Sequence, residues 1–320
     1  MAGLPEALTA ALYDLTAALD GARLEKDARV ISEAYRMKTG TGKRLLTREG
    51  EAAAYAAARM PATYEAAHAA IESALTASGL SPRTLLDCGA GTGAASWAAD
   101  HLLALGAVTC LEREDAMRMV GGRLMQAGGD ALRGAQWHAF DLTDAKLLPQ
   151  AELVVEGYML GELAEEMRLP VARRLWEACT QMLVLIEPGT PQGFANLAAV
   201  RRELAGLGAY VAAPCPSGSE DCPMVGEDWC HFAVRVQRTR LHKSLKGGDA
   251  PYEDEKYCYL ALMREKPVHA CAARVLRHPL IAPGRITLTL CEADGKKIRI
   301  VTKKDPLWKR ARKIGAGDRL

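Results

Sequence analysis

The sequence predicts an α/β protein built on a doubly wound, mainly parallel sheet. Five short apolar runs lie at 84–89, 107–112, 135–140, 151–158 and 182–189, and a segment long enough for a helix or a long loop separates each run from the next. Continuous apolar strands that alternate with helices are typical of a parallel sheet buried on both faces. A glycine-rich loop follows the first run and opens a helical segment.

Residues 1–78 are expected to form an N-terminal helical region, because Ala and Leu recur there with helical periodicity. The polar, glycine-containing stretch at 39–43 is expected to break this region. Pro61 is expected to interrupt or start a helix, since proline has no backbone N–H to donate.

Residues 79–270 are expected to hold the sheet. A cysteine- and proline-rich insertion lies at 211–235, and an apolar run at 257–265 could add a late strand. Residues 271–320 are expected to form a small β appendage and a basic tail, because two β-like runs are joined there by the turn signal at 293–295.

The composition predicts a soluble globular protein, since 49% of the residues are hydrophobic and 25% are charged. No apolar run approaches the roughly 20 residues that cross a bilayer, so no membrane contact is expected. The N-terminal stretch contains acidic residues and lacks a positively charged segment followed by a long apolar one. We therefore expect a cytoplasmic protein, and the sequence leaves its oligomeric state open.

Basic residues cluster in two stretches, although the net charge is only +2. The stretches at 235–246 and 296–313 are either solvated faces or contacts to the phosphates of a nucleic acid. Nine cysteines, an odd number in a chain without an export signal, argue against a disulfide framework.

The glycine-rich loop is the first candidate site. Gly89, Gly91 and Gly93 let the backbone turn tightly and approach a ligand that a Cβ would exclude. The helix that follows offers free N–H groups to polar ligand atoms. Asp87 and Ala90 complete the motif, whose glycines stand closer together than in the dinucleotide fingerprint. The loop resembles motif I of class I methyltransferases, whose ligand is S-adenosylmethionine; a nicotinamide cofactor or a bare structural turn is the alternative.

Two acidic residues are expected to complete the cofactor site. Glu112 ends the second apolar run, where a carboxylate can bind both ribose hydroxyls, and Asp141 closes the third run, where a side chain can meet an adenine edge. The loop after the fourth run holds Tyr158, which could stack on a base, and Glu162, which could orient a nucleophile. The alternative is that Tyr158 and Glu162 only build the loop.

Three cysteines lie close together within the insertion. Cys215, Cys222 and Cys230 are flanked by prolines, whose turns can direct several thiolates to one point. Thiolates suit zinc or an iron–sulfur cluster, but the spacing C-x6-C-x7-C does not specify the metal. A fourth ligand could be Cys258, Cys271 or Cys291, and the alternative is a set of buried free thiols.

Several longer stretches together resemble the Rsm22 family. They are LLDCGAGTGAASWAA, YMLGEL, LVLIEPGTPQGF, WCHF, YEDEKYCYLALMRE and TLTLCEADGKKIRIVTKKD, and the resemblance covers roughly residues 30–320. It implies a class I methyltransferase (Rossmann-like) fold and a role in maturation of the small ribosomal subunit or in its translation. Mitochondrial members carry a 4Fe-4S cluster held by four cysteines. Carried over by motif, the ligands would be Cys215, Cys222, Cys230 and Cys291; the resemblance, and not the spacing, selects Cys291.

These features predict an S-adenosylmethionine-dependent methyltransferase, or a protein derived from one, that acts on small-subunit ribosomal RNA. The cluster would be structural, with zinc as the alternative metal, and the small ribosomal subunit and its rRNA would be the partners. A second hypothesis is a non-catalytic assembly factor that retains the fold, because the loop after the fourth run lacks the (Asp/Asn)-Pro-Pro-(Tyr/Phe) pattern frequent in amino-methylating enzymes. A third is a small-molecule methyltransferase.

Overall fold

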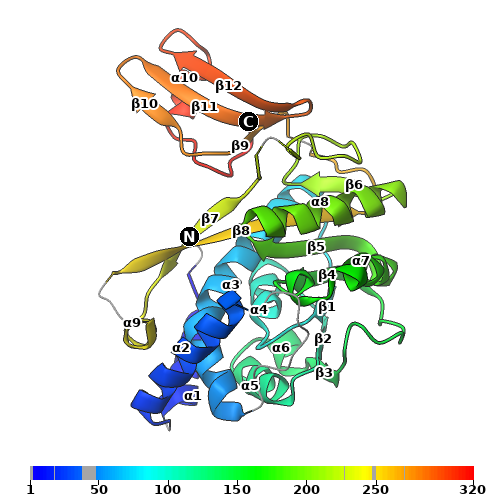
Figure 1. Ribbon diagram of the computed structural model, residues 1–320, viewed down its shortest axis with the longest axis vertical. Coiled ribbons are helices and arrows are strands. Elements are labelled where there is room, and N and C mark those ends of the chain that lie inside the picture. Colours follow the sequence, from blue (N-terminus) through cyan, green and yellow to red (C-terminus); the bar gives the residue numbers. More distant parts are fainter. Residues whose placement is uncertain (1–2, 18, 38–47, 227, 247–249, 270) are drawn as a thin grey trace.

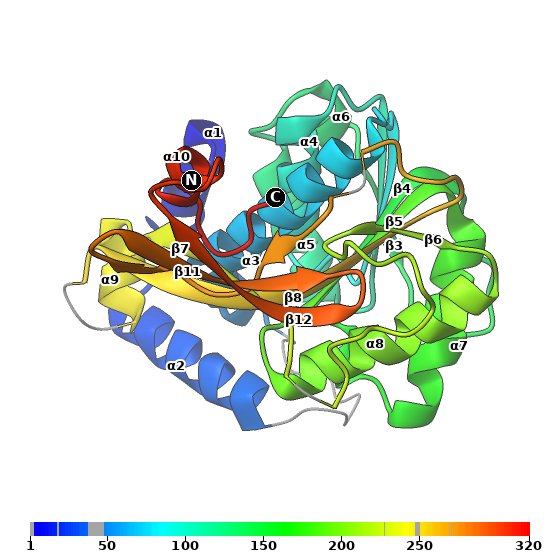
Figure 2. The same ribbon diagram turned by 90° about the horizontal axis from the view of Figure 1, so that it is seen from above.

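The fold is described from a computed structural model of the chain, which defines residues 3–17, 19–37, 48–226, 228–246, 250–269 and 271–320. The expected break at 39–43 lies outside these residues. Figure 1 shows the order of the elements, and Figure 2 shows the same ribbon from above.

Three helices precede the sheet: α1 (Glu6–Ala17), α2 (Gly21–Met37) and α3 (Glu49–Ser78). The predicted helical region is therefore present, but the expectation for Pro61 was wrong, because α3 runs through it without a break. Proline removes one helical hydrogen bond. Pro61 is buried on a helix with 19 buried residues, and such packing outweighs the local preference.

The main sheet has eight strands: β1 (Thr84–Cys88), β2 (Ala107–Glu112), β3 (Gln136–Ala139), β4 (Ala151–Gly157), β5 (Cys179–Pro188), β6 (Tyr210–Ala213), β7 (Phe232–Gln237) and β8 (Tyr252–Met263). Their order is β3-β2-β1-β4-β5-β8-β6, and β7 pairs with the first half of β8. Strands β1 to β5 are parallel, whereas β8 runs antiparallel to both β5 and β6. This is the doubly wound sheet of a class I methyltransferase fold, as predicted.

Helices cover both faces of this sheet. The connecting elements are α4 (Ala94–Leu102), α5 (Asp115–Met125), α6 (Asp130–Arg133), η1 (Leu160–Glu162), α7 (Glu165–Ala178), α8 (Pro191–Gly206) and α9 (Arg240–Lys246). Neighbouring residues of β1 point to opposite faces: Leu85 joins a core with α3, α4 and α5, and Leu86 joins one with α7 and α8. The N-terminal helices thus share one core with the sheet. Among the described residues, no helix has the length and apolar character to span a membrane.

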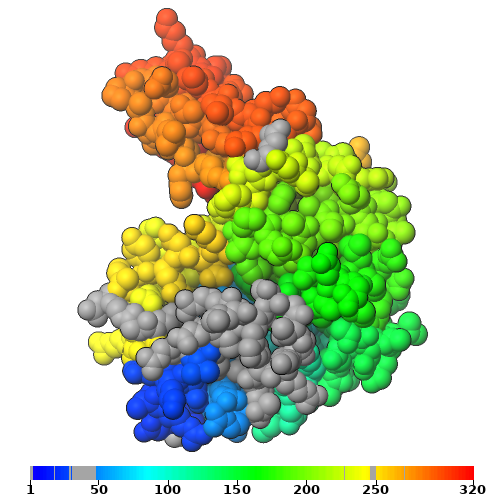
Figure 3. All heavy atoms as spheres, in the orientation of Figure 1, coloured from blue at the N-terminus to red at the C-terminus, as the bar shows by residue number. Residues whose placement is uncertain are grey.

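A small antiparallel sheet forms the C-terminal appendage, which consists of β9 (Arg274–Val275), β10 (Leu280–Ala282), β11 (Arg285–Glu292), β12 (Gly295–Thr302) and α10 (Trp308–Ala311). Strands β11 and β12 form the predicted hairpin, and Gly295 has a positive φ of 121° at its turn. The appendage has its own apolar core around Ile286, Leu288 and Val301. It projects from the body in Figures 1 and 3.

Candidate functional site

The glycine-rich loop joins β1 to α4 with the tight turn that the sequence predicts. Gly89, Gly91 and Gly93 have φ angles of 70°, 55° and 86°, a region that residues with a Cβ rarely adopt. The N–H groups of Gly89 and Ala90 both donate to the Leu111 carbonyl, at 2.9 and 3.0 Å. These bonds hold the loop against the end of β2.

Glu112, at the end of β2, lies directly beside this loop. Its Oε2 accepts a hydrogen bond from the Gly91 N–H at 2.9 Å, and its Oε1 accepts one from the Glu114 N–H at 2.8 Å. Each carboxylate oxygen has two acceptor positions, so both can still accept from further donors. A carboxylate oriented in this way can bind a pair of neighbouring hydroxyls.

The other two acidic residues of the predicted cofactor site shape their own segments. Asp87 is buried, and its Oδ2 accepts from the Ser96 N–H at 3.1 Å and from the Ser96 hydroxyl at 2.6 Å. Burial raises the pKa of Asp87 to about 6. Asp141 Oδ1 accepts from the N–H and the hydroxyl of Thr143, at 2.9 and 2.7 Å, in the turn after β3. Asp87 thus secures the first turn of α4, and Asp141 orders the turn after β3.

Tyr158 is tightly engaged within the loop after β4. It has a positive φ of 64°, and its N–H donates to the Ile186 carbonyl at 2.7 Å. Its hydroxyl donates to Glu255 Oε1 on β8 at 3.3 Å, and Glu255 is paired with Arg59 of α3 at 3.2 Å. These contacts favour the alternative in which Tyr158 builds the loop.

Two buried carboxylates that sequence reasoning missed hold the same loop. Glu156 Oε1 accepts from the N–H groups of Met159 and Leu160, at 2.7 and 3.2 Å, and Glu187 Oε1 accepts from the Gly161 N–H at 3.3 Å. Burial, with the neighbouring Glu187, raises the pKa of Glu156 well above its ordinary value, and burial raises the pKa of Glu187 to about 7. Each of the two glutamates is the next-to-last residue of a largely apolar strand, and this position is the signal that could have identified them.

Glu162 ends η1 at the same edge of the sheet as Glu112. Burial raises the pKa of Glu162 to about 7, although the nearby Arg113 opposes this shift. A carboxyl group with such a pKa can accept a proton near neutral pH.

The loop after β4 also contacts the glycine-rich loop. A Cβ on Gly89 would lie 3.2 Å from Met159 Cγ, which is closer than ordinary contact. The carboxyl ends of β1, β2, β4 and β5 therefore form one connected edge, which we call the cofactor edge. Its members are the loop 89–93, Glu112 and the loop 157–163.

The four predicted ligand cysteines lie in one neighbourhood between the body and the appendage. Cys222 and Cys230 pack against a buried group that includes Cys291. A hydrogen bond between the thiols of Cys215 and Cys222 lowers the pKa of Cys222 to about 7 and, with burial, raises that of Cys215. Burial raises the pKa of Cys230, and its neighbours Cys215 and Cys291 add to this effect. Within the defined parts of the chain, however, no three His, Cys, Asp or Glu side chains are arranged to hold a metal ion.

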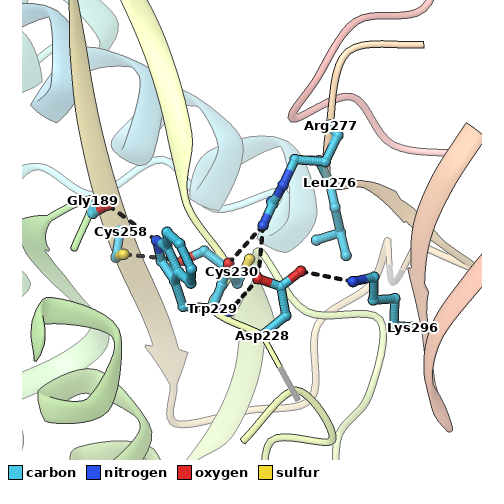
Figure 4. A network of polar contacts seen from close by, with 8 residues as sticks. All are labelled: Gly189, Asp228, Trp229, Cys230, Cys258, Leu276, Arg277 and Lys296. Carbon is cyan, nitrogen blue, oxygen red and sulfur yellow. Dashed lines mark hydrogen bonds and ion pairs between the residues drawn. The ribbon is translucent and has the colours of Figure 1, made fainter. Parts of the chain in front are cut away.

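The two other candidates for a fourth ligand have different partners. The Cys258 thiol donates to the Cys230 carbonyl at 3.0 Å, as Figure 4 shows, and Cys258 is buried in the core beneath α8. The Cys271 sulfur lies 3.9 Å from both Arg274 Nη2 and the Pro214 carbonyl oxygen.

Two buried arginines flank the cysteines. Arg201 is 2% exposed and donates from Nη1 to the Cys215 sulfur at 2.9 Å, with its other N–H groups on the carbonyls of Ser217 and Ser219. Arg274 is 3% exposed and donates to the Pro214 carbonyl at 2.8 Å. Across the described ranges, neither forms a salt bridge with a carboxylate. A buried cation is costly unless a negative charge compensates it, so this neighbourhood favours an anionic centre.

The two basic stretches are partly neutralised. In the first, Arg235 pairs with Asp254 at 3.1 Å and lies over the Tyr252 ring. In the second, Lys297 pairs with Asp294 at 2.8 Å. These pairs reduce, without removing, the positive charge of each stretch.

Comparisons with known proteins identify several proteins to which this chain is similar. The chain is 27% identical over 289 residues to the human (Homo sapiens) protein named ribosome assembly protein METTL17, mitochondrial; the match covers 85% of this chain and 62% of that protein, so the chain spans about three fifths of the relative's length. Similar solved structures include magnesium protoporphyrin IX methyltransferase from Synechocystis PCC 6803 with bound SAM, at 12% identity, 78% and 99% coverage of this and that chain, and a TM-score of 0.43. The plantazolicin methyltransferase BpumL in complex with SAH matches at 10% identity, 77% and 98% coverage, and a TM-score of 0.44.

A protein-family model also matches most of the chain. The family model described as mitochondrial small ribosomal subunit Rsm22 matches residues 49–320. This range contains the cofactor edge, the cysteines of the insertion and the whole appendage. The chain belongs to the Rsm22 family.

Proposed function

We propose that this chain is an S-adenosylmethionine-binding protein that acts in assembly of the small ribosomal subunit. The position of Glu112 is the observation that supports cofactor binding. Its carboxylate accepts a hydrogen bond from the Gly91 N–H at 2.9 Å, beside three glycines of positive φ. Ribose hydroxyls would donate to Glu112, and the loop backbone would approach the methionine part. The subunit is inferred from the family description and from the name of the human relative.

Calorimetry of the full chain with S-adenosylmethionine tests the cofactor. We expect one site, weakened roughly tenfold or more by Glu112→Gln, because a charged acceptor is lost. Gly122→Ala is the matched control, since Gly122 lies on α5 and a Cβ there would meet nothing closer than 3.8 Å. A wild-type chain that does not bind the cofactor would overturn the proposal.

Methylation of small-subunit rRNA is the finer form of this proposal. Glu162 supports it, because its carboxyl group, with a pKa of about 7, could take up the proton that a target nitrogen releases. The non-catalytic assembly factor is favoured by a different observation: Tyr158, Glu156 and Glu187 all use their polar groups to hold the loop itself. Transfer of labelled methyl groups to naked rRNA and to small subunits separates the two. Cofactor binding without transfer to either substrate would support the assembly factor.

We also propose that Cys215, Cys222, Cys230 and Cys291 hold a 4Fe-4S cluster. Four thiolates around such a cluster give it net negative charge, which would compensate the buried Arg201 and Arg274. The cluster would cross-link the insertion to the appendage, because Cys215, Cys222 and Cys230 belong to the insertion and Cys291 to β11. Four thiolate ligands would leave no iron position open to a substrate.

Anaerobic purification with iron, sulfide and zinc analysis tests this site. We expect a brown protein. Cys291→Ser should lose iron, whereas Cys179→Ser should keep it, because Cys179 belongs to a buried apolar core and is not one of the four proposed ligands. A colourless protein with stoichiometric zinc would show that these four cysteines bind zinc and not an iron–sulfur cluster. A protein without either metal would overturn the site.

A further inference from the structure

We propose that Arg59 is a positioning residue of the cofactor edge, although it lies on α3, outside the sheet. Arg59 holds Glu255, Glu255 holds Tyr158, and this chain of contacts fixes the loop 157–163 against the glycine-rich loop. The inference rests on the proposed S-adenosylmethionine site and identifies what keeps one wall of that site in place.

The first step is a bidentate ion pair between α3 and β8. Arg59 Nη2 lies 3.2 Å from Glu255 Oε1, and Nη1 lies 3.5 Å from Oε2. The side chains of Arg59 and Glu255 are 29% and 15% exposed, so the pair is partly sheltered from water. A sheltered, two-pronged pair is both stronger and more directional than an exposed one.

The second step passes through a shared oxygen. Glu255 Oε1, which receives Arg59, also accepts the Tyr158 hydroxyl at 3.3 Å. Without Arg59, this carboxylate would be free to turn towards solvent and release the hydroxyl.

The third step concerns the backbone. Tyr158 has a φ of 64°, a conformation that residues with a Cβ hold only when their surroundings fix it. The hydroxyl bond and the N–H bond to Ile186 provide that restraint. The next residue, Met159, packs on Gly89, so a relaxed Tyr158 would shift Met159 on the cofactor loop.

Tyr55, one turn before Arg59 on α3, connects the same helix face with the rest of the edge. Burial raises the pKa of Tyr55 to about 12, while Arg59 opposes this shift and Glu162 and Glu112 add to it. The charges of Glu112 and Glu162, at the ends of β2 and η1, therefore act on this face of α3.

Cofactor affinity gives the first test. Arg59→Met and Tyr158→Phe should each weaken S-adenosylmethionine binding roughly tenfold, and the double variant should be no weaker than either single one, because both break the same chain. Arg59→Lys should recover part of the loss. The control is Arg123→Met, which breaks an exposed 3.3 Å pair with Glu49 at the start of α3. Unchanged affinity in Arg59→Met, or additive losses in the double variant, would overturn the inference.

The methyl resonance of Met159 gives a second test that needs no cofactor. In a chain labelled at the methionine methyl groups, Arg59→Gln should shift the Met159 signal, which is assigned through Met159→Leu, and Arg123→Gln should not. If this shift occurs and the wild-type chain fails to bind the cofactor, the inference stands and the proposed function fails. If the Met159 signal stays in place, the inference fails, whatever the cofactor does.

Discussion

Asp228 and Lys296, 68 positions apart in the chain, meet at 2.9 Å between the cysteine-rich insertion and β12. The same carboxylate receives Arg277 at 3.0 Å, and Arg277 also donates to the Trp229 carbonyl at 3.2 Å (Figure 4). Lys296 and Arg277 both belong to the C-terminal appendage. One carboxylate therefore fastens the appendage to the body.

Asp228→Asn should loosen this attachment. Hydrogen bonds to charged groups contribute about 1.5–3 kcal/mol, and the variant weakens two of them. We expect a protease to cleave the connecting segment 264–273 faster in this variant than in the wild type. Mass spectrometry of the fragments identifies the cleavage sites and their rates. Asp221→Asn is the control, because Asp221, in the same insertion, forms an exposed pair with Arg202 of α8 at 2.5 Å. Equal cleavage rates in the two variants would contradict this role for Asp228.

Glu162 should make the stability of the fold depend on pH. Its pKa rises from 4.5 to about 7 on folding, so the folded chain binds the proton more tightly than the unfolded chain. Stability from this group is therefore lost as the pH rises from about 4.5 to about 7. Glu162→Gln should melt like the wild type near pH 4.5 and be more stable by about 1–2 kcal/mol at pH 8. Thermal unfolding at both pH values measures this, and a constant difference would contradict it.

Gly93→Ala should disturb the cofactor loop. Its φ of 86° strains any residue with a Cβ, at a cost of about 1–2 kcal/mol, and the new Cβ would lie 2.5 Å from Met125 Cε. Gly122→Ala, inside α5, should instead stabilise the protein by about 0.5–1 kcal/mol. Melting temperature and cofactor affinity should fall together in the first variant only. A Gly93→Ala protein that binds like the wild type would exclude a role for this turn.

The basic stretch at 296–313 should make the affinity for RNA depend on the salt concentration. Replacing Lys303, Lys304, Lys309 and Lys313 by Gln should lower the slope of log affinity against log salt by roughly one unit for each lost phosphate contact. Binding of a small-subunit rRNA fragment, titrated at several salt concentrations, measures the slope. Arg235→Gln and Arg238→Gln form the comparison, because these side chains already pair with Asp254 and Glu253. If the slope of the tail variant is unchanged, the tail is a solvated face.

The parallel half of the sheet could be predicted closely. The apolar run 107–112 coincides with β2, and the run 151–158 differs from β4 by one residue, because strands buried on both faces are continuously apolar. The direction of β8 and its place between β5 and β6 could not be predicted, because an apolar run carries no information about the direction of its strand. The course of α3 through Pro61 likewise depends on packing that local sequence does not reveal.

The candidate site divides in the same way. Gly89, Gly91, Gly93 and Glu112 could be predicted because a short motif and the end of one strand define them. The contact between Arg59 and Glu255 joins residues 196 positions apart, and each is an ordinary charged residue in its own segment. Only the packing of α3 across β8 brings them together.

Strand β8 borders both candidate sites at once. Glu255 on one face reaches Arg59 and Tyr158, while Cys258, on the opposite face, donates to the Cys230 carbonyl. Slippage by a single residue along β5 would exchange these faces and detach both partners together. Both sites therefore depend on the register between β8 and β5. An insertion or deletion within 255–258 should disable the cofactor site and the cysteine site together.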